Sequence, residues 1–509
     1  MSLQPITFTQ SQNSLGGTVA GADYISGMLH YTAAAPSGFT LGVAKEVFGT
    51  AQLASLGINN TYSDETQATG TITLVLGAVG DTINVKVTEP GINGTTNIVN
   101  LGTYTVQSTD TTSTILAASV AAFVNLGTPT TGYTATSTAA IVTIKARVSL
   151  GIALNTGTPL AVVIVGTTTA TLSQFSGGVA SKQAAWYYQI SEFFRLAPTA
   201  VLWVGFFAVP STYNFSEITT MQTQALGVIR QFGVYSPHGT SVSNIAADLD
   251  ALQIVLAANA TAYMPCVGLL ASNISGITNP ATLANLRLRT DPLCTYVLGQ
   301  DGGGQGAWLF LTTGASVPAW GAALGTEASA NVSQDIGAVG AFNISNGTED
   351  AVLAIANGNL ITNLSANLLN QLDSYGYLFL TYFVGTTGSY WNDSPTCIST
   401  ANNFCYIERN RTIQKVQRTV FTAITPLVRG NIYANSDGTI AAGSVSVIQN
   451  AINPGLKAMV AAGNISEYQI VIPTNQNVAS TSTLNIEVDI VGVGIARFIN
   501  VALNLVVSI

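Results

Sequence analysis

Residues 201–234 run VLWVGFFAVPSTYNFSEITTMQTQALGVIRQFGV and carry the pattern that decides the fold. The apolar run 201–207 predicts a strand, the segment 215–225 a helix, and 227–234 a second strand. The alternation continues with a helix at 244–260, a strand at 264–270, a helix at 280–288 and a strand at 294–298. Because strands that alternate with amphipathic helices build mostly parallel sheets covered by helices, we expect an α/β body here.

Residues 60–178 differ in composition from the α/β region, because Thr, Val, Ile and Gly dominate there. Short alternating runs at 71–76, 82–87, 141–144 and 160–165 are separated by turn residues, and one helix is expected at 113–124. Strands of this length and spacing predict an all-β sandwich. Since residues 24–56 are too few to build a core alone, we interpret 60–178 as a domain inserted into the α/β body.

The last hundred residues predict two helices followed by three strands. The helices are expected at 410–428 and 444–462, the second broken at Asn453 and Pro454 because proline restarts a helix more easily than it continues one. The first strand begins at Tyr468. In 484–490 every even position is apolar, and in 499–509 every odd position is apolar, which is typical of half-buried strands.

Both ends of the sequence resemble strands that lack a partner. The final segment has apolar side chains at alternate positions: Ile499, Val501, Leu503, Leu505 and Val507. Near the start, Ile6 and Phe8 alternate with threonines, and a frayed terminus is the alternative interpretation there. Because single proteins usually protect open strand edges, two such ends favour strand exchange between subunits.

The composition excludes several classes of protein. Only 8% of the 509 residues are charged, whereas an ordinary soluble domain carries about 25%. With 47% hydrophobic residues the chain is not intrinsically disordered, and a formal charge of −8 argues against nucleic-acid binding. Neutral polar faces suit a subunit that is buried against its neighbours, since it does not need charges to keep monomers apart.

Neither a membrane span nor a signal peptide is expected. The most apolar run, 200–209, is about half the length that a spanning helix needs. The N-terminal stretch MSLQPITFTQ lacks the basic and apolar regions of a signal peptide. The four cysteines show no CxxC spacing and are expected to be buried free thiols.

No constellation of residues predicts catalysis, a cofactor or a metal. There are only two histidines, His30 and His238, and no GxSxG motif accompanies them. The run DGGGQG at 301–306 is glycine-rich, but no Gly-Lys-Ser/Thr follows and a strand is expected next. We therefore expect a flexible loop there and not a phosphate cradle.

One electrostatic feature stands out in a chain so poor in charge. Five of the 16 Lys and Arg residues lie within 409–429. On the predicted helix, Arg411, Lys415 and Arg418 share one face with Arg429, opposite an apolar face. A solvated face is one interpretation, and docking onto an acidic partner is the other.

The C-terminal third resembles the sheath proteins of contractile phage tails and contractile injection systems, and the resemblance covers 323–509. The matching segments are ALG at 323–325, NVSQDIG at 331–337, YGY at 375–377, GSYWND at 388–393, YIERNRTI at 406–413, YQIVIP at 468–473 and GIARFI at 494–499. This is a match in the order of elements, carried by several segments together.

The resemblance implies a non-enzymatic subunit that forms stacked rings around an inner tube and contracts to drive the tube through a target envelope. Each subunit would lend its N-terminal arm and C-terminal strand to neighbours, and Arg411, Lys415 and Arg418 would face the tube. Partners would be copies of this chain, the inner tube protein, and baseplate and tail terminator proteins. The protein would belong to a virion tail assembled in the host cytoplasm.

Taken together, these observations predict a multidomain α/β fold with a sheath-type core, helices on a mixed sheet, an inserted β-sandwich and strand-like arms. The expected division is 1–20 arm, 21–59 first part of the core, 60–178 insertion, 179–400 α/β domain and 401–509 C-terminal domain. Two other functions stay open: an α/β hydrolase with a β-sandwich binding module, and a cell-surface lattice or adhesin protein.

Overall fold

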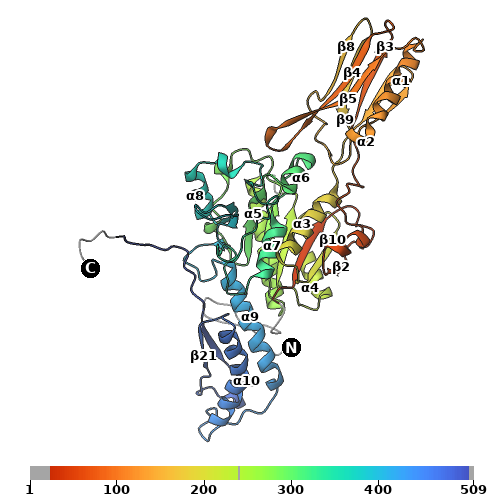
Figure 1. Cartoon of the computed structure of the whole chain (residues 1–509). Coiled ribbons are helices and arrows are strands. Elements are labelled where there is room, and N and C mark those ends of the chain that lie inside the picture. The colour runs from red at the N-terminus through yellow and green to blue at the C-terminus, as the bar shows by residue number, and fades with distance from the viewer. Residues whose placement is uncertain (1–22, 239–240, 504–509) are drawn as a thin grey trace.

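A seven-stranded mixed sheet forms the body of the chain (Figure 1). The computed structural model describes residues 23–238 and 241–503. In spatial order the strands are β17 (Tyr377–Leu378), β14 (Cys294–Val297), β12 (Val267–Ser272), β11 (Gln231–Ser236), β1 (Ser26–Tyr31), β10 (Leu202–Phe207) and β2 (Ala44–Val47). Neighbouring strands are parallel except β2, which pairs antiparallel with β10 at the edge. The predicted α/β class is therefore confirmed, and residues 26–31 supply a central strand.

Helices cover both faces of this sheet. They are α3 (Lys182–Leu196), α4 (Glu217–Gln224), α5 (Val242–Thr261), α6 (Gln305–Thr313), α7 (Trp320–Ser329) and α8 (Ala366–Ser374). Helix α7 lies against β11 at Gly233, where a Cβ atom would come within 2.6 Å of the Trp320 ring. On β10, which is separated from β11 by β1, Gly205 makes room for Met221 of α4 in the same way. Glycine in these strands thus permits close packing of helix on sheet.

Short two-stranded ladders connect the body elements. They pair β13 (Thr290–Asp291) with β20 (Cys397–Ile398), β15 (Gly299–Asp301) with β16 (Leu353–Ile355), and β18 (Leu380–Thr381) with β19 (Tyr390–Trp391). The helix expected at 280–288 is absent: two 3-10 turns, Pro280–Thr282 and Leu286–Leu288, take its place. Asn279 and Asn285 cap these turns through their side chains, which competes with a continuous helix.

Residues 69–176 form a β-rich unit with its own core. A four-stranded sheet has the order β6 (Thr134–Thr138), β7 (Ile141–Lys145), β3 (Thr69–Val75), β9 (Thr169–Ser176), and a three-stranded sheet the order β5 (Thr96–Thr105), β4 (Thr82–Pro90), β8 (Leu160–Val165). The inward side chains of both sheets share one apolar cluster with helix α1 (Ser113–Leu126), and the short helix α2 (Thr128–Thr131) follows. This unit lies at one end of the molecule in Figure 1.

Asp81 links the turns at one end of the β-rich unit. Its Oδ2 accepts the N–H groups of Ala78, Thr167 and Thr168 at 2.7–3.0 Å. Although burial raises the pKa of Asp81, hydrogen bonds from the hydroxyl and N–H of Thr168 and the N–H groups of Thr167 and Ala78 lower it to about 2.

The low pKa of Asp81 predicts acid sensitivity of the β-rich unit. A carboxylate with a depressed folded-state pKa stabilises the fold above its unfolded pKa of about 4, and this contribution is lost as the pH falls toward 2. We expect the melting temperature of the wild type to fall between pH 4 and pH 2 more steeply than that of Asp81→Asn. Parallel curves for the two proteins, measured by circular dichroism, would contradict this assignment.

The C-terminal unit lies at the end of the molecule opposite to the β-rich unit (Figure 1). It contains α9 (Ile407–Ile424), a 3-10 turn (Thr425–Leu427), α10 (Ala442–Ala461), β21 (Glu467–Val471), the short helix α11 (Val478–Thr481) and β22 (Glu487–Val491). The break predicted at Pro454 is wrong, since α10 continues through it. Pro454 lies on the exposed side of α10. Within the described residues no helix is long and apolar enough to cross a membrane.

Candidate functional site

The residues that could have suggested an enzyme are engaged in structural contacts. His30 is buried in β1 and stacks on Phe206, and burial lowers its pKa to about 3, so the ring is neutral. His238 Nδ1 lies 3.3 Å from Asp248 Oδ1 on α5. The buried Ser236 accepts the backbone N–H of His238. This arrangement orders a turn and a helix start.

The glycine-rich segment 301–306 differs from the prediction, because helix α6 and not a strand follows it. Asp301 accepts the N–H groups of Gly303, Gly304 and Gly306 at 3.0–3.1 Å. Glu349 accepts the N–H of Gln305 at 3.0 Å. Carboxylates of the same chain therefore occupy these N–H donors. The four cysteines are buried free thiols, as expected.

Near the C-terminal end, Arg497 lies among three carboxylates. Its Nε donates to Asp393 Oδ1 at 2.7 Å, and its Nη2 donates to Glu408 Oε1 at 2.8 Å. The same Nη2 lies 3.2 Å from Asp335 Oδ2. The guanidinium also lies over the ring of Tyr406, with Cζ 3.5 Å from the ring centroid. With its side chain 15% exposed, Arg497 is held from several sides at once.

The charges in this cluster depend on one another. Burial and repulsion from Glu408 and Asp393 raise the pKa of Asp335 to about 6, although Arg497 lowers it. Burial lowers the pKa of Arg497, but the three carboxylates raise it further than that, so the guanidinium stays charged. Removal of the guanidinium would leave three carboxylates in a poorly solvated place without a counter-charge.

Four of the segments that carry the family resemblance meet in this cluster. Asp335 comes from 331–337, Asp393 from 388–393, Glu408 from 406–413 and Arg497 from 494–499. The sequence singled out each segment but did not predict that they meet. The signal available was one acidic residue in each of three segments and one arginine in the fourth, within a chain that has few charges.

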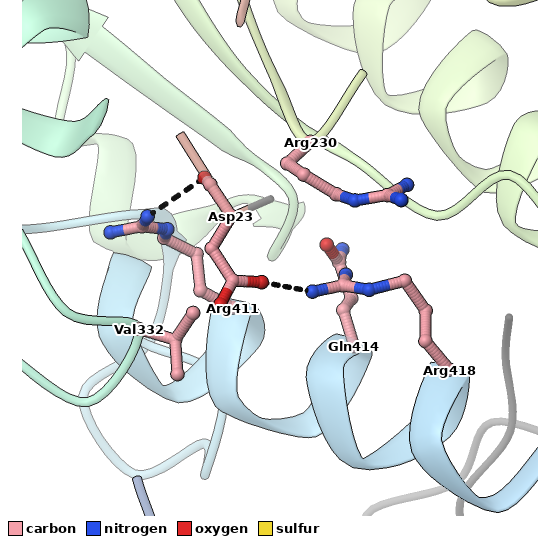
Figure 2. Close-up of a pocket in the computed structure, with 6 residues that line it drawn as sticks. All are labelled: Asp23, Arg230, Val332, Arg411, Gln414 and Arg418. Carbon is pink, nitrogen blue, oxygen red and sulfur yellow. Dashed lines mark hydrogen bonds and ion pairs between the residues drawn. The ribbon is translucent and has the colours of Figure 1, made fainter. Parts of the chain in front are cut away.

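A second cluster of opposite sign lies on the same helix, α9. Figure 2 shows Asp23 between Arg411 and Arg418, which both project from α9. Arg230 lies on the side of the cluster that faces away from this helix. Asp23 Oδ1 contacts Arg418 Nη2 and Asp23 Oδ2 contacts Lys415 Nζ, both at 2.5 Å. The backbone carbonyl of Asp23 accepts from Arg411 Nη2 at 3.4 Å. Asp23 therefore pairs with one face of α9 through three basic side chains.

The basic stripe of α9 is largely buried within the chain. The side chains of Arg411 and Arg418 are 3% and 2% exposed, and that of Lys415 is 18% exposed. In the single chain their charges face Asp23 and Glu327, and the contact with an inner tube stays a prediction. Helical spacing identified the stripe, but the spacing does not indicate which segment covers it.

The basic cluster is only partly neutralised. Four cations, Arg230, Arg411, Lys415 and Arg418, face two carboxylates, Asp23 and Glu327. Burial and repulsion from Arg230 lower the pKa of Arg418 to about 9, although Asp23 raises it. Burial raises the pKa of Glu327 to about 7, although Arg411, whose Nε lies 3.7 Å from Glu327 Oε1, lowers it. Asp23 is thus the main counter-charge.

Beyond Arg497 the described chain runs away from the body without pairing (Figure 1). Ile499, Val501 and Leu503 are 79%, 73% and 90% exposed. The strand expected at 499–509 is therefore not formed within 499–503 of this single chain. Leu505 and Val507, like Ile6 and Phe8, lie outside the described residues.

The hairpin of β21 and β22 offers an unpaired edge on each side. The two strands pair antiparallel from Glu467–Val491 to Val471–Glu487, and neither pairs with another described strand. Val488, Ile470 and Tyr468 on one face pack with α9 and α10. The packing on the helices stabilises the hairpin, while the N–H and C=O groups of its outer edges remain available to a further strand.

Comparison with solved structures gives similarity over about three fifths of the chain. The anti-feeding prophage helical sheath in its contracted state is 15% identical, with a TM-score of 0.42, over 62% of this chain and 81% of that one. A chain of the anti-feeding prophage baseplate is 13% identical (TM-score 0.40, 63% and 80%), and the contracted PVC sheath of an extracellular contractile injection system is 10% identical (TM-score 0.40, 64% and 81%). No curated protein matches the sequence. Residues 403–509, which carry α9, α10 and the β21–β22 hairpin, match the family described as DUF2586, C-terminal domain.

Proposed function

We propose that this chain is a structural subunit of a contractile tail sheath, the class of protein that its C-terminal third resembles in sequence. Copies of the chain would form stacked rings around an inner tube, and contraction would drive that tube through a target envelope. One observation carries the proposal. The same chain has an exposed, alternating apolar segment at 499–503 and a hairpin, β21–β22, with open edges.

A segment and an acceptor of this kind fit each other chemically. An added strand would satisfy the unpaired N–H and C=O groups of the hairpin edge, and its alternate side chains would continue the apolar face that packs on α10. Burial of Ile499, Val501 and Leu503 would stabilise the contact by about 1.5–3 kcal/mol for each side chain. Because closure within one chain would leave subunits unlinked, exchange between neighbours is the arrangement that produces a continuous mesh.

The other partners follow from the same proposal. They are an inner tube protein, baseplate proteins and a terminator protein, in a virion tail assembled in the host cytoplasm. In the single chain the basic face of α9 pairs with Asp23, so its contact with an inner tube stays a prediction. The β-rich unit, at the far end from the C-terminal unit, would project outward as a decoration.

Contraction of such a sheath needs no chemical reaction. A lattice assembled in an extended state can release free energy by burying more surface between subunits when it shortens. The low charge of the chain suits this, because neutral faces can be repacked without desolvating many ions.

Negative-stain electron microscopy of the purified full chain tests the proposal. We expect tubes or stacked rings, with more of them when the inner tube protein is present. Dispersed monomers under all conditions, including high protein concentration and added tube protein, would contradict the sheath assignment.

A further inference from the structure

We propose that helix α9 is the common anchor of both ends of the chain, holding Arg497 near the N-terminal end of the helix and Asp23 further along the same face, through ion pairs of opposite polarity. Asp23 is the residue that follows 1–22, and Arg497 precedes the exposed residues 498–503. Each end is therefore fixed by one charged side chain inserted into a cluster of the opposite charge.

The two anchor points share one stripe of the helix. Glu408 binds Arg497, and Arg411, Lys415 and Arg418 contact Asp23. Their positions follow a spacing of three, four and three residues, so they fall within about 80° around the helix axis. From Glu408 to Arg418 the rise along the axis is about 15 Å. One rigid element thus sets both the position and the separation of the two ends.

The packing around each anchor explains why it can resist displacement. Arg497 forms ion pairs with carboxylates from three parts of the chain. These are Asp393 in the loop after β19, Asp335 in the segment after α7, and Glu408 on α9. Withdrawal of Arg497 would leave Asp335 and Glu408, whose side chains are 9% and 4% exposed, without their counter-charge. In the same way, withdrawal of Asp23 would leave Arg418, at 2% exposure, without its counter-charge. Buried charges that lose their partners oppose such movement strongly.

A mechanical consequence rests on the proposed function. If both ends pair with neighbouring subunits, a force applied to one end is transmitted to the other end through α9. The inserted β-rich unit does not carry this force. The anchoring itself is a property of the single chain and does not depend on the sheath proposal.

Proteolysis at one bond tests the C-terminal anchor in the unassembled full chain. Trypsin cleaves after Arg497, and its access to that bond reports how often the anchor opens. We expect the double variant Asp393→Asn, Glu408→Gln to increase cleavage at this bond about tenfold or more, because two of three counter-charges are removed. The matched control is Glu487→Gln, Asp489→Asn, which removes two exposed carboxylates from β22 and should leave the rate unchanged.

The N-terminal anchor has an equivalent test with a protease that cleaves before aspartate. Arg418→Gln is expected to increase cleavage between Ala22 and Asp23 about tenfold, whereas Lys457→Gln on exposed α10 should not. Cleavage rates equal to wild type at both ends would overturn the proposal. An increase that also affected sites in the body, such as Arg195, would show general unfolding, and it too would count against a local anchor.

A conservative variant separates anchoring from simple packing. Arg497→Lys keeps the charge and the trypsin site but loses the fork that reaches Asp393 and Glu408 together. We expect intermediate cleavage, between wild type and the double variant. These measurements use dispersed protein, so a chain that never forms tubes can still show the anchors, and a chain that forms tubes can still lack them.

Discussion

Deletion of residues 501–509 is expected to leave a folded chain that forms neither tubes nor stacked rings. Val501 and Leu503 are 73% and 90% exposed, so their removal costs the isolated fold little, within about 0.5 kcal/mol. Arg497 and its carboxylates remain in place. In an assembly, loss of these two side chains alone would remove about 3–6 kcal/mol of burial from each contact. That corresponds to a fall in affinity on the order of 10²–10⁴-fold.

Thermal unfolding followed by circular dichroism would verify that the truncated chain is folded, and negative-stain microscopy would score assembly. A substitution pair provides a sharper control than truncation alone. Val501→Asn with Leu503→Asn changes the apolar side of the alternation, and Asn500→Ser with Ala502→Ser changes the other side. We expect the first pair to prevent assembly and the second to permit it. Normal tubes from the truncated chain would rule out exchange of the C-terminal strand.

Local patterns predicted the elements of this chain well, because they depend on neighbours in sequence. The apolar runs at 201–207 and 264–270 correspond to β10 and β12, and the predicted helix at 244–260 corresponds to α5. Two of the failures are also local. Asparagine side chains replaced the helix at 280–288 with capped turns, and α10 tolerated Pro454 on its exposed side.

The candidate site was harder to predict from the sequence, since it depends on contacts between distant segments. The stripe of Arg411, Lys415 and Arg418 is visible from helical spacing alone. Its partner Asp23 lies almost four hundred residues away, and nothing near Asp23 marks it as a counter-charge. A lone aspartate in front of a buried strand carries no periodic signal. Sequence reasoning therefore found the basic face but assigned it to another molecule.

The second large effect concerns that same aspartate. Asp23→Ala is expected to lower the free energy of unfolding by about 3–5 kcal/mol, the usual cost of removing one partner from a buried ion pair. Arg418 would keep its charge at 2% exposure beside Arg411, with Arg230 also in the cluster. Urea titration followed by tryptophan fluorescence measures the change. Asp489→Ala, at an exposed position of β22, is the matched control and should change stability by less than about 0.5 kcal/mol.

The decisive comparison is the double variant Asp23→Ala, Arg418→Met. If the loss in the single variant comes from an unpaired buried charge, replacing Arg418 with an apolar side chain of similar length removes that charge and should recover most of the stability. If the loss came instead from packing of the Asp23 side chain, the second substitution would add its own cost and the double variant would be less stable than either single one. The sign of the coupling therefore separates the two causes. Recovery would establish that Asp23 acts as the counter-charge of α9, whereas further loss would show that Asp23 stabilises the chain through packing.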